Sequence, residues 1–195
     1  MSIAVFASGS GSNFESLVER SRKQWPRPVS LLISDKPQAG ALERAERLGV
    51  PAFVFQPKSY ENKAAYEQAI LAVLQEHEIE WILLAGYMRL IGPTLLGSYP
   101  WRILNIHPSL LPAFQGKDAV EQALAYGVRW TGVTVHWVDE GMDTGPIIDQ
   151  KPVLVEPEET LESLMKKVQF VEHNLYPATV YKLLTGKIPD RPSGR

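Results

Sequence analysis

Short apolar runs that alternate with longer amphipathic segments constrain the fold of this chain more than any other feature. The amphipathic segments have the apolar spacing of helices, at residues 13–22, 38–48 and 60–77. The apolar runs are almost continuous in hydrophobicity, which is typical of strands buried on both faces of a parallel sheet. These runs are I-A-V-F-A (3–7), V-S-L-L-I-S (29–34), A-F-V-F (52–55), W-I-L-L-A (81–85) and I-L-N-I (103–106). The alternation predicts an α/β fold with a doubly wound, mostly parallel twisted sheet.

The second half of the chain has a different pattern. A helix is expected near 118–126, and strands at 132–138 and 147–155 follow with only a turn between them. So short a connection requires an antiparallel pair. A last helix is expected from about residue 160 to 184. We predict a single domain of about seven strands, with a Rossmann-like half (1–100), a half that contains an antiparallel strand (101–185) and a loose tail (186–195).

Composition excludes several classes of function. The chain has 195 residues and a formal net charge of -2, so its charge gives no sign of nucleic-acid binding. It contains no cysteine, which excludes disulfides and thiolate chemistry. The start lacks the pattern of a signal peptide, and no apolar stretch reaches the roughly 18 residues that a membrane helix needs. We therefore expect a cytoplasmic protein that binds neither nucleic acid nor membranes; whether it is a monomer or a homodimer stays open.

The first expected strand leads directly into a glycine-rich stretch, S-G-S-G-S-N (8–13), which precedes a helix. Glycines let the backbone approach a ligand closely, and the N–H groups at a helix start attract anions. We expect Ser12 or Asn13 to cap this helix or to bind a phosphate oxygen. The stretch contains G-x-G, but Phe14 stands where a dinucleotide fingerprint has its third glycine. A terminal phosphate is favoured over a dinucleotide, and Asp35, after the second strand, either contacts a ribose or caps a turn.

The stretch N-I-H-P-S-L-L-P (105–112) places two polar side chains at the end of an apolar strand. Asn105 and His107 are two residues apart, so in a strand they point to the same face. Pro108 and Pro112 end the strand and stiffen the loop that follows. Open α/β sheets bind ligands at the carboxyl ends of their strands, so we expect both side chains to face a ligand. A purely structural histidine is the alternative.

The loop D-E-G-M-D-T-G-P-I (139–147) contains a carboxylate, Asp143, that could complement His107. A carboxylate beside an imidazole favours the imidazolium, which is a proton donor near neutral pH. With the amide of Asn105 it would form an oxyanion-stabilising site for acyl transfer. No serine stands in a nucleophile elbow, so the nucleophile must come from a substrate, such as an amine. If Asp143 does not meet His107, it is a solvated or turn-capping acid.

The remaining histidines have structural interpretations. His77 ends a helix, His136 alternates within a strand, and His173 lies on the last helix. The sequence has no H-x-x-x-H or H-E-x-x-H spacing, so we expect no zinc or other metal site.

Five stretches together resemble a known family. They are S-G-S-G-S-N (8–13), L-A-G-Y-M-R-L-I (84–91), N-I-H-P-S-L-L-P (105–112), G-V-T-V-H (132–136) and D-E-G-M-D-T-G-P-I (139–147). In this order they are similar to the phosphoribosylglycinamide formyltransferases (glycinamide ribonucleotide transformylases), a family of folate-dependent formyltransferases. The resemblance implies direct formyl transfer from the co-substrate 10-formyltetrahydrofolate to the amine of 5′-phosphoribosylglycinamide in purine biosynthesis, without a metal.

The resemblance also implies roles for individual residues. His107 would be the general acid and oxyanion donor, Asn105 its partner, and Asp143 the group that tunes His107 and helps to deprotonate the amine. The ribonucleotide is implied to contact Gly11, Ser12, Asn13, Pro108, Gln169 and Glu172. The folate is implied to contact Lys63, Met88, Arg89, Leu90, Ile91, Asn105, Asp139, Glu140, Gly141, Met142 and Asp143. Residues 1–100 would be the phosphate-binding half, and 101–185 the catalytic and folate-binding half.

Other interpretations stay open. A formyltetrahydrofolate hydrolase resembles this domain but carries an N-terminal regulatory domain, for which a first strand at residue 2 or 3 leaves no room. A methionyl-tRNA formyltransferase needs a C-terminal nucleic-acid-binding domain and usually lacks S-G-S-N. From another class, a nicotinamide-nucleotide-binding oxidoreductase or a non-catalytic nucleotide-binding module would bind NAD(H) and be indifferent to the loss of His107. Phe14, where Leu is common in the family, and G-K-D-A at 116–119 are mild departures.

Overall fold

A computed structural model describes residues 2–192 and contains one seven-stranded sheet in the order β3-β2-β1-β4-β5-β6-β7. The strands are β1 (Ser2–Phe6), β2 (Val29–Ser34), β3 (Ala52–Val54), β4 (Ile79–Leu84), β5 (Ile103–His107), β6 (Trp130–Trp137) and β7 (Ile147–Leu154). Strands β1 to β5 pair in parallel, and β6 runs antiparallel to both of its neighbours. The predicted mostly parallel sheet with an antiparallel strand in the C-terminal half is confirmed.

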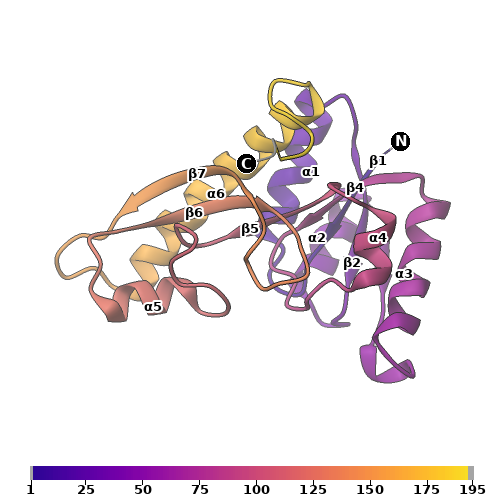
Figure 1. The fold of residues 1–195 in the computed structure, drawn as a ribbon, viewed down its shortest axis with the longest axis horizontal. Helices are drawn as coiled ribbons and strands as arrows, with labels where there is room; N and C mark the ends of the chain where they lie inside the picture. Colours follow the sequence, from indigo (N-terminus) through magenta and orange to yellow (C-terminus); the bar gives the residue numbers. More distant parts are fainter. Residues whose placement is uncertain (1, 193–195) are drawn as a thin grey trace.

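Helices cover both faces of this sheet (Figure 1). They are α1 (Ser12–Gln24), α2 (Gly40–Leu48), α3 (Lys63–Glu76), α4 (Pro93–Ser98), α5 (Ala119–Tyr126) and α6 (Leu161–Leu184), with a 3-10 turn η1 (Pro57–Ser59). Helices α1, α2, α5 and α6 pack into one hydrophobic cluster, and α3 and α4 into another. Strand β1 separates the two clusters, because Ile3 and Val5 belong to the first and Ala4 and Phe6 to the second.

The order of the strands places a ligand crevice at one edge of the sheet. The chain moves from β1 to β2 on one side of β1, and later returns to β4 on its other side. Such a reversal leaves a crevice outside the carboxyl ends of the strands. The stretches 8–13, 84–91 and 105–112 lie at the carboxyl ends of β1, β4 and β5, so three of the five motif stretches meet there.

The start of α3, the presence of α4 and the end of β5 differ from the sequence-based expectation. Helix α3 begins at Lys63 rather than at residue 60, because Pro57 starts the 3-10 turn and Asn62 caps the helix by accepting the Ala65 N–H (3.0 Å). The sequence pattern does not predict α4, which has only six residues and contains Gly97. Strand β5 extends to His107, so this histidine is part of the sheet.

The described part of the C-terminal tail contacts the body of the protein. Ile188 packs against a hydrophobic cluster, and Asp190 lies 3.1 Å from the guanidinium of Arg102. The tail is therefore attached at these two residues, and residues 193–195 lie outside the described part of the chain.

Candidate functional site

A cleft of about 730 Å³ lies at the carboxyl ends of the parallel strands, where the motif stretches meet. Its lining includes most of the residues that the sequence singles out. These are Gly11, Ser12, Asn13, Met88, Arg89, Leu90, Ile91, Asn105, His107, Pro108, Gly141, Met142, Asp143, Gln169 and Glu172. Lys63, Asp139 and Glu140 are not among the described residues that line it.

Asn105, His107 and Asp143 meet in this cleft. His107 is 4% exposed at the end of β5, and its Nδ1 lies 3.3 Å from the Asp143 Oδ2. Its other ring nitrogen, Nε2, lies 2.8 Å from the carbonyl oxygen of Phe114. Both ring nitrogens of His107 thus face hydrogen-bond acceptors, which fix the orientation of the ring. The structure brings together the histidine and the carboxylate that the sequence only suggested as a pair.

The carboxylate of Asp143 is surrounded by donors. It accepts the N–H of Gly116 (2.9 Å) and an amide hydrogen of Asn105 (3.3 Å), and it faces the rings of His107 and His136. Burial raises the pKa of the Asp143 carboxyl, but hydrogen bonds from His136 and Gly116 and the charges of the two histidines outweigh it. The net effect lowers this pKa below its ordinary value of 3.8, so the carboxylate is ionised at neutral pH.

His136 lies in strand β6, as expected, and its side chain also belongs to the same cluster. It lies directly opposite Asn105 in the register of β5 and β6. Its Nδ1 donates to the Trp137 carbonyl oxygen (2.7 Å), and its Nε2 lies 3.1 Å from the amide nitrogen of Asn105. The amide hydrogens of Asn105 therefore face His136 and Asp143. For this amide to stabilise an oxyanion, one of the two contacts must be released.

The opposite part of the cleft is formed by the glycine-rich loop and the start of α1. Gly11 precedes the helix with a φ of 78°, and no described side chain caps it, so the expected cap by Ser12 or Asn13 is wrong. Glu15 is the first residue whose N–H bonds inside the helix, to the Gly11 carbonyl oxygen (3.0 Å). The preceding N–H groups are thus available to an anion.

Helix α6 closes this end of the cleft with two polar side chains. The Gln169 amide donates to the Ser12 hydroxyl (2.9 Å), and the Asn13 amide donates to the Glu172 carboxyl (3.2 Å). Burial raises the pKa of Glu172 to about 7, although the hydrogen bond from Asn13 opposes this. Near neutral pH the Glu172 carboxyl is therefore partly protonated and can both donate and accept hydrogen bonds.

Residues 85–91, which follow β4, form one wall of the cleft, and Asp35 fixes this wall by a hydrogen bond to Arg89. The side chain of Asp35 is buried, where it accepts hydrogen bonds from the Ser8 hydroxyl (2.5 Å) and from Arg89 Nε (2.7 Å). The Met88 N–H donates to the same Ser8 hydroxyl (3.3 Å). Asp35 thus neither caps a turn nor offers a free carboxylate to a ribose. It holds the wall that Met88 and Arg89 present to the cleft.

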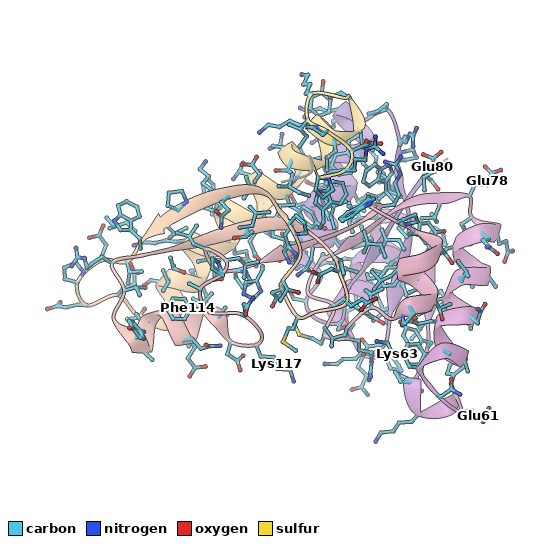
Figure 2. All side chains as sticks on the ribbon, in the orientation of Figure 1. Glu61, Lys63, Glu78, Glu80, Phe114 and Lys117 are labelled. Carbon is cyan, nitrogen blue, oxygen red and sulfur yellow. The ribbon has the colours of Figure 1, made fainter. Side chains whose placement is uncertain are left out.

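The loop 139–143 contributes only part of its length to the cleft. Gly141 and Met142 line it, and Met142 is 51% exposed. Asp139 instead accepts hydrogen bonds from the Gly141 N–H (3.0 Å) and the Thr144 hydroxyl (2.7 Å), so it shapes the loop. Lys63 lies at the start of α3, away from Phe114 and Lys117 in the segment before α5 (Figure 2).

A sequence profile described as formyl transferase matches residues 1–180. The chain belongs to the formyl transferase family. It is 57% identical over 182 residues to the phosphoribosylglycinamide formyltransferase of Bacillus subtilis (strain 168), over 93% of each chain. The crystal structure of phosphoribosylglycinamide formyltransferase from Bacillus halodurans is similar with a TM-score of 0.92 and 54% identity, over 96% of this chain and 97% of that one. The crystal structure of glycinamide ribonucleotide transformylase 1 from Geobacillus kaustophilus is similar with a TM-score of 0.90 and 57% identity, over 93% of this chain and 97% of that one.

Several residues in the cleft of this formyl transferase escape prediction from the sequence. Besides His136, they include Lys36, Tyr87, Lys117 and Met165. Lys36 follows β2, so its place at the carboxyl end of a strand next to β1 could have indicated it. Met165 carries no such signal, because its position depends on how α6 packs over the cleft.

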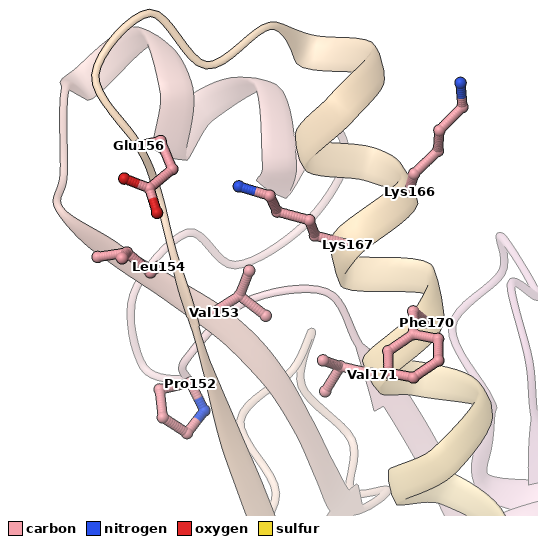
Figure 3. A pocket seen from close by; sticks show the side chains of 8 residues that line it. All are labelled: Pro152, Val153, Leu154, Glu156, Lys166, Lys167, Phe170 and Val171. Atoms are coloured by element: carbon pink, nitrogen blue, oxygen red, sulfur yellow. The ribbon is translucent and has the colours of Figure 1, made fainter.

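A second depression, between β7 and α6, has a volume of about 540 Å³ (Figure 3). Its charged groups are Glu156, Lys166 and Lys167, and the two lysines pair with Glu162 and Glu159. Figure 3 shows Lys166 directed away from the depression. Because it lacks histidine and amide groups, this depression does not compete with the first as a catalytic site. Among residues 2–192, no cluster of His, Cys, Asp and Glu is placed to hold a metal ion, and no helix could cross a membrane.

Proposed function

We propose that this formyl transferase moves the formyl group of 10-formyltetrahydrofolate to the primary amine of 5′-phosphoribosylglycinamide, in purine biosynthesis. The observation that carries the proposal is that Asn105, His107 and Asp143 line the same cleft as the glycine-rich loop. An anion site and a set of proton-transfer groups in one cleft suit a substrate with a phosphate and a reactive amine. The relative in Bacillus subtilis is named for this activity.

In the proposed reaction, the amine nitrogen attacks the formyl carbon, a C–N bond forms, and the formyl oxygen becomes an oxyanion. His107 stabilises this oxyanion after its Nε2 exchanges the Phe114 carbonyl for the formyl oxygen. Asn105 adds an amide hydrogen that it releases from Asp143 or His136. Asp143 orients the ring of His107 through its contact with Nδ1 and helps to take a proton from the amine. The bond from the formyl carbon to the folate nitrogen then breaks, and that nitrogen receives the proton.

The ribonucleotide would occupy the α1 and α6 end of the cleft. Backbone N–H groups of Gly11, Ser12 and Asn13 suit the phosphate, since no described side chain caps the helix. Gln169 and Glu172 face the same end and suit ribose hydroxyls, because both can donate and accept hydrogen bonds. Pro108, also in the lining, would pack against the sugar or the amine arm.

The folate would lie against the stretch 88–91 and under the loop 139–143. Met88 and Leu90 are 58% and 45% exposed, which gives the pterin and its benzoyl group an apolar surface. Gly141 and Met142 would cover the ring, whereas Asp139 and Glu140 would act only through the shape of the loop. Lys63 would reach only the glutamate end of the folate. Both halves contribute to both substrates, so we treat residues 1–195 as one domain.

One assay tests the proposal. Purified protein is mixed with 10-formyltetrahydrofolate, with and without 5′-phosphoribosylglycinamide, and the folate product is followed by absorbance. Product that forms only with the ribonucleotide is expected. Equal product with water alone would contradict the proposal and indicate a formyltetrahydrofolate hydrolase. Binding of NAD(H) without formyl transfer would support the nucleotide-binding alternative, which the engaged carboxylate of Asp35 disfavours. We also propose a cytoplasmic location, in line with relatives that are named as biosynthetic proteins.

A further inference from the structure

Helix α2 holds the glycine-rich loop through contacts with three consecutive residues. The Ala41 N–H, in the first turn of α2, donates to the Gly9 carbonyl oxygen (3.1 Å). Arg44, one turn further on, donates from Nε to the Ser10 carbonyl oxygen (2.8 Å). The backbone of Gly11 lies so close to α2 that a Cβ added to Gly11 would be 2.5 Å from the Ala41 Cα. The loop is therefore fixed against α2 by its carbonyl groups.

These two hydrogen bonds set the direction of two peptide groups. In a trans peptide the C=O and the following N–H point in opposite directions. With the Gly9 and Ser10 carbonyls turned toward α2, the N–H groups of Ser10 and Gly11 point to the other side of the loop. Residues 9–13 line the cleft, and the free N–H groups of α1 come next in the chain. Successive N–H groups on one side of a loop form an anion-binding concavity.

Arg44 acts on this concavity by geometry rather than by charge. It is not among the described residues that line the cleft, and its side chain is 32% exposed. Its guanidinium forms an ion pair with Glu15 in the first turn of α1, which offsets its charge locally. The same guanidinium thus joins the Ser10 carbonyl to the first turn of α1. Arg47 also pairs with Glu15, but among residues 2–192 it donates to no carbonyl of the loop.

We infer that Arg44 is a positioning residue for the phosphate of the substrate: its hydrogen bond to the Ser10 carbonyl turns the N–H groups of the loop toward the phosphate. The inference rests on the proposed function, because it assigns the phosphate of the ribonucleotide to this loop. Arg44 lies on α2 and does not line the cleft, so it would affect substrate specificity without contacting the phosphate.

The experiment compares two substrates and two arginines. Arg44→Met keeps most of the side-chain stem and removes the donors, and Arg47→Met is the matched control on the same helix. For each protein, kcat and KM are measured with 5′-phosphoribosylglycinamide and with its dephosphorylated ribonucleoside, and inorganic phosphate is tested as a competitive inhibitor. Arg44→Met should raise KM for the ribonucleotide and the inhibition constant of phosphate by roughly tenfold, as for one charge-assisted hydrogen bond. Its kcat/KM for the ribonucleoside and its KM for the folate should stay within about twofold of wild type.

The outcomes separate this inference from the proposed function. Equal losses with both substrates would show a general structural role for Arg44 and overturn the inference. An equal effect of Arg47→Met would show that charge, not the Ser10 contact, is responsible, and would also overturn it. If wild type does not prefer the phosphorylated substrate, the proposed phosphate site itself is wrong. If Arg44→Met does not fold, Arg44→Lys, which keeps the charge beside Glu15 but not the planar donor, should show the same selective change.

Discussion

The two ends of the cleft are built from different parts of the chain. At the glycine-rich loop the proposed binding groups are backbone N–H groups of the loop and of the uncapped start of α1, and α2 holds the loop in place. At the other end the groups are side chains of β5, β6 and the 139–143 loop, which contact one another. A backbone site is sensitive to an added methyl group, and a side-chain site to a removed group. Substitutions that add atoms should therefore impair binding at the glycine-rich loop, and substitutions that remove side-chain groups should impair catalysis at the other end.

The largest effect is expected when the ring of His107 is removed. His107→Asn should lower kcat by roughly 10²–10³, the loss typical of one oxyanion donor, while both KM values stay within about threefold. Steady-state kinetics with both substrates would measure this split. His77→Asn, at the end of α3, is the control and should behave like wild type. A kcat for His107→Asn within about fivefold of wild type would exclude His107 as the donor.

Asp143→Asn should lower kcat by roughly 10², because the ring of His107 loses the carboxylate that orients it and the amine loses a proton acceptor. It also has a pH signature in stability. The pKa of the folded Asp143 carboxyl lies below its ordinary value of 3.8, so its ionised form stabilises the fold above that pH. That contribution is lost as the pH falls through the lowered pKa. In urea unfolding, wild type should therefore exceed the variant at pH 7, and the difference should shrink in stronger acid; a constant difference would contradict the assignment.

The backbone end should fail when a methyl group is added to Gly11. Its φ of 78° and the 2.5 Å approach of a Cβ to the Ala41 Cα mean that alanine would be both strained and overpacked. Gly11→Ala should lower the free energy of unfolding by about 2–5 kcal/mol and raise KM for the ribonucleotide. Gly9→Ala is the matched control for stability, since a Cβ there meets nothing within 4 Å. Equal stabilities of the two variants in thermal unfolding would contradict this account.

The same contrast explains how much the sequence could predict. Most of the parallel strands were predictable because they are local apolar runs, and the glycine-rich loop because its residues are consecutive. The pairing of His107 with Asp143 followed from topology, since a strand end and a loop near it meet at one edge. His136 depends on the register between β5 and β6, and the burial of Asp35 depends on Arg89, 54 residues away. Neither feature can be predicted from a local sequence pattern, because both depend on residues that are far apart in the chain.

A smaller effect is expected at Glu172, and it concerns stability rather than rate. The pKa of Glu172 in the folded chain is about 7, above its ordinary value of 4.5. Wild type should therefore lose stability as the pH rises from 4.5 to 7, because ionising the partly buried carboxyl is unfavourable. Glu172→Gln does not titrate, so it should gain about 1–3 kcal/mol over wild type at pH 8 and nothing at pH 4. Glu162→Gln, exposed on the same helix, is the control in urea unfolding, and a similar pH-dependent gain there would contradict the assignment.

The smallest effect is expected at Lys63, which belongs to neither end of the cleft. Its side chain lies against Gly92, just beyond the wall formed by residues 88–91, and outside the described lining. Lys63→Met should leave kcat unchanged and raise KM for the folate by less than about threefold, as for an exposed ion pair. The rise should grow with additional glutamates on the folate and disappear at high salt, because exposed charges are screened. Lys58→Met in η1 is the control, and a tenfold rise that salt does not reduce would mean that Lys63 enters the cleft when the folate binds.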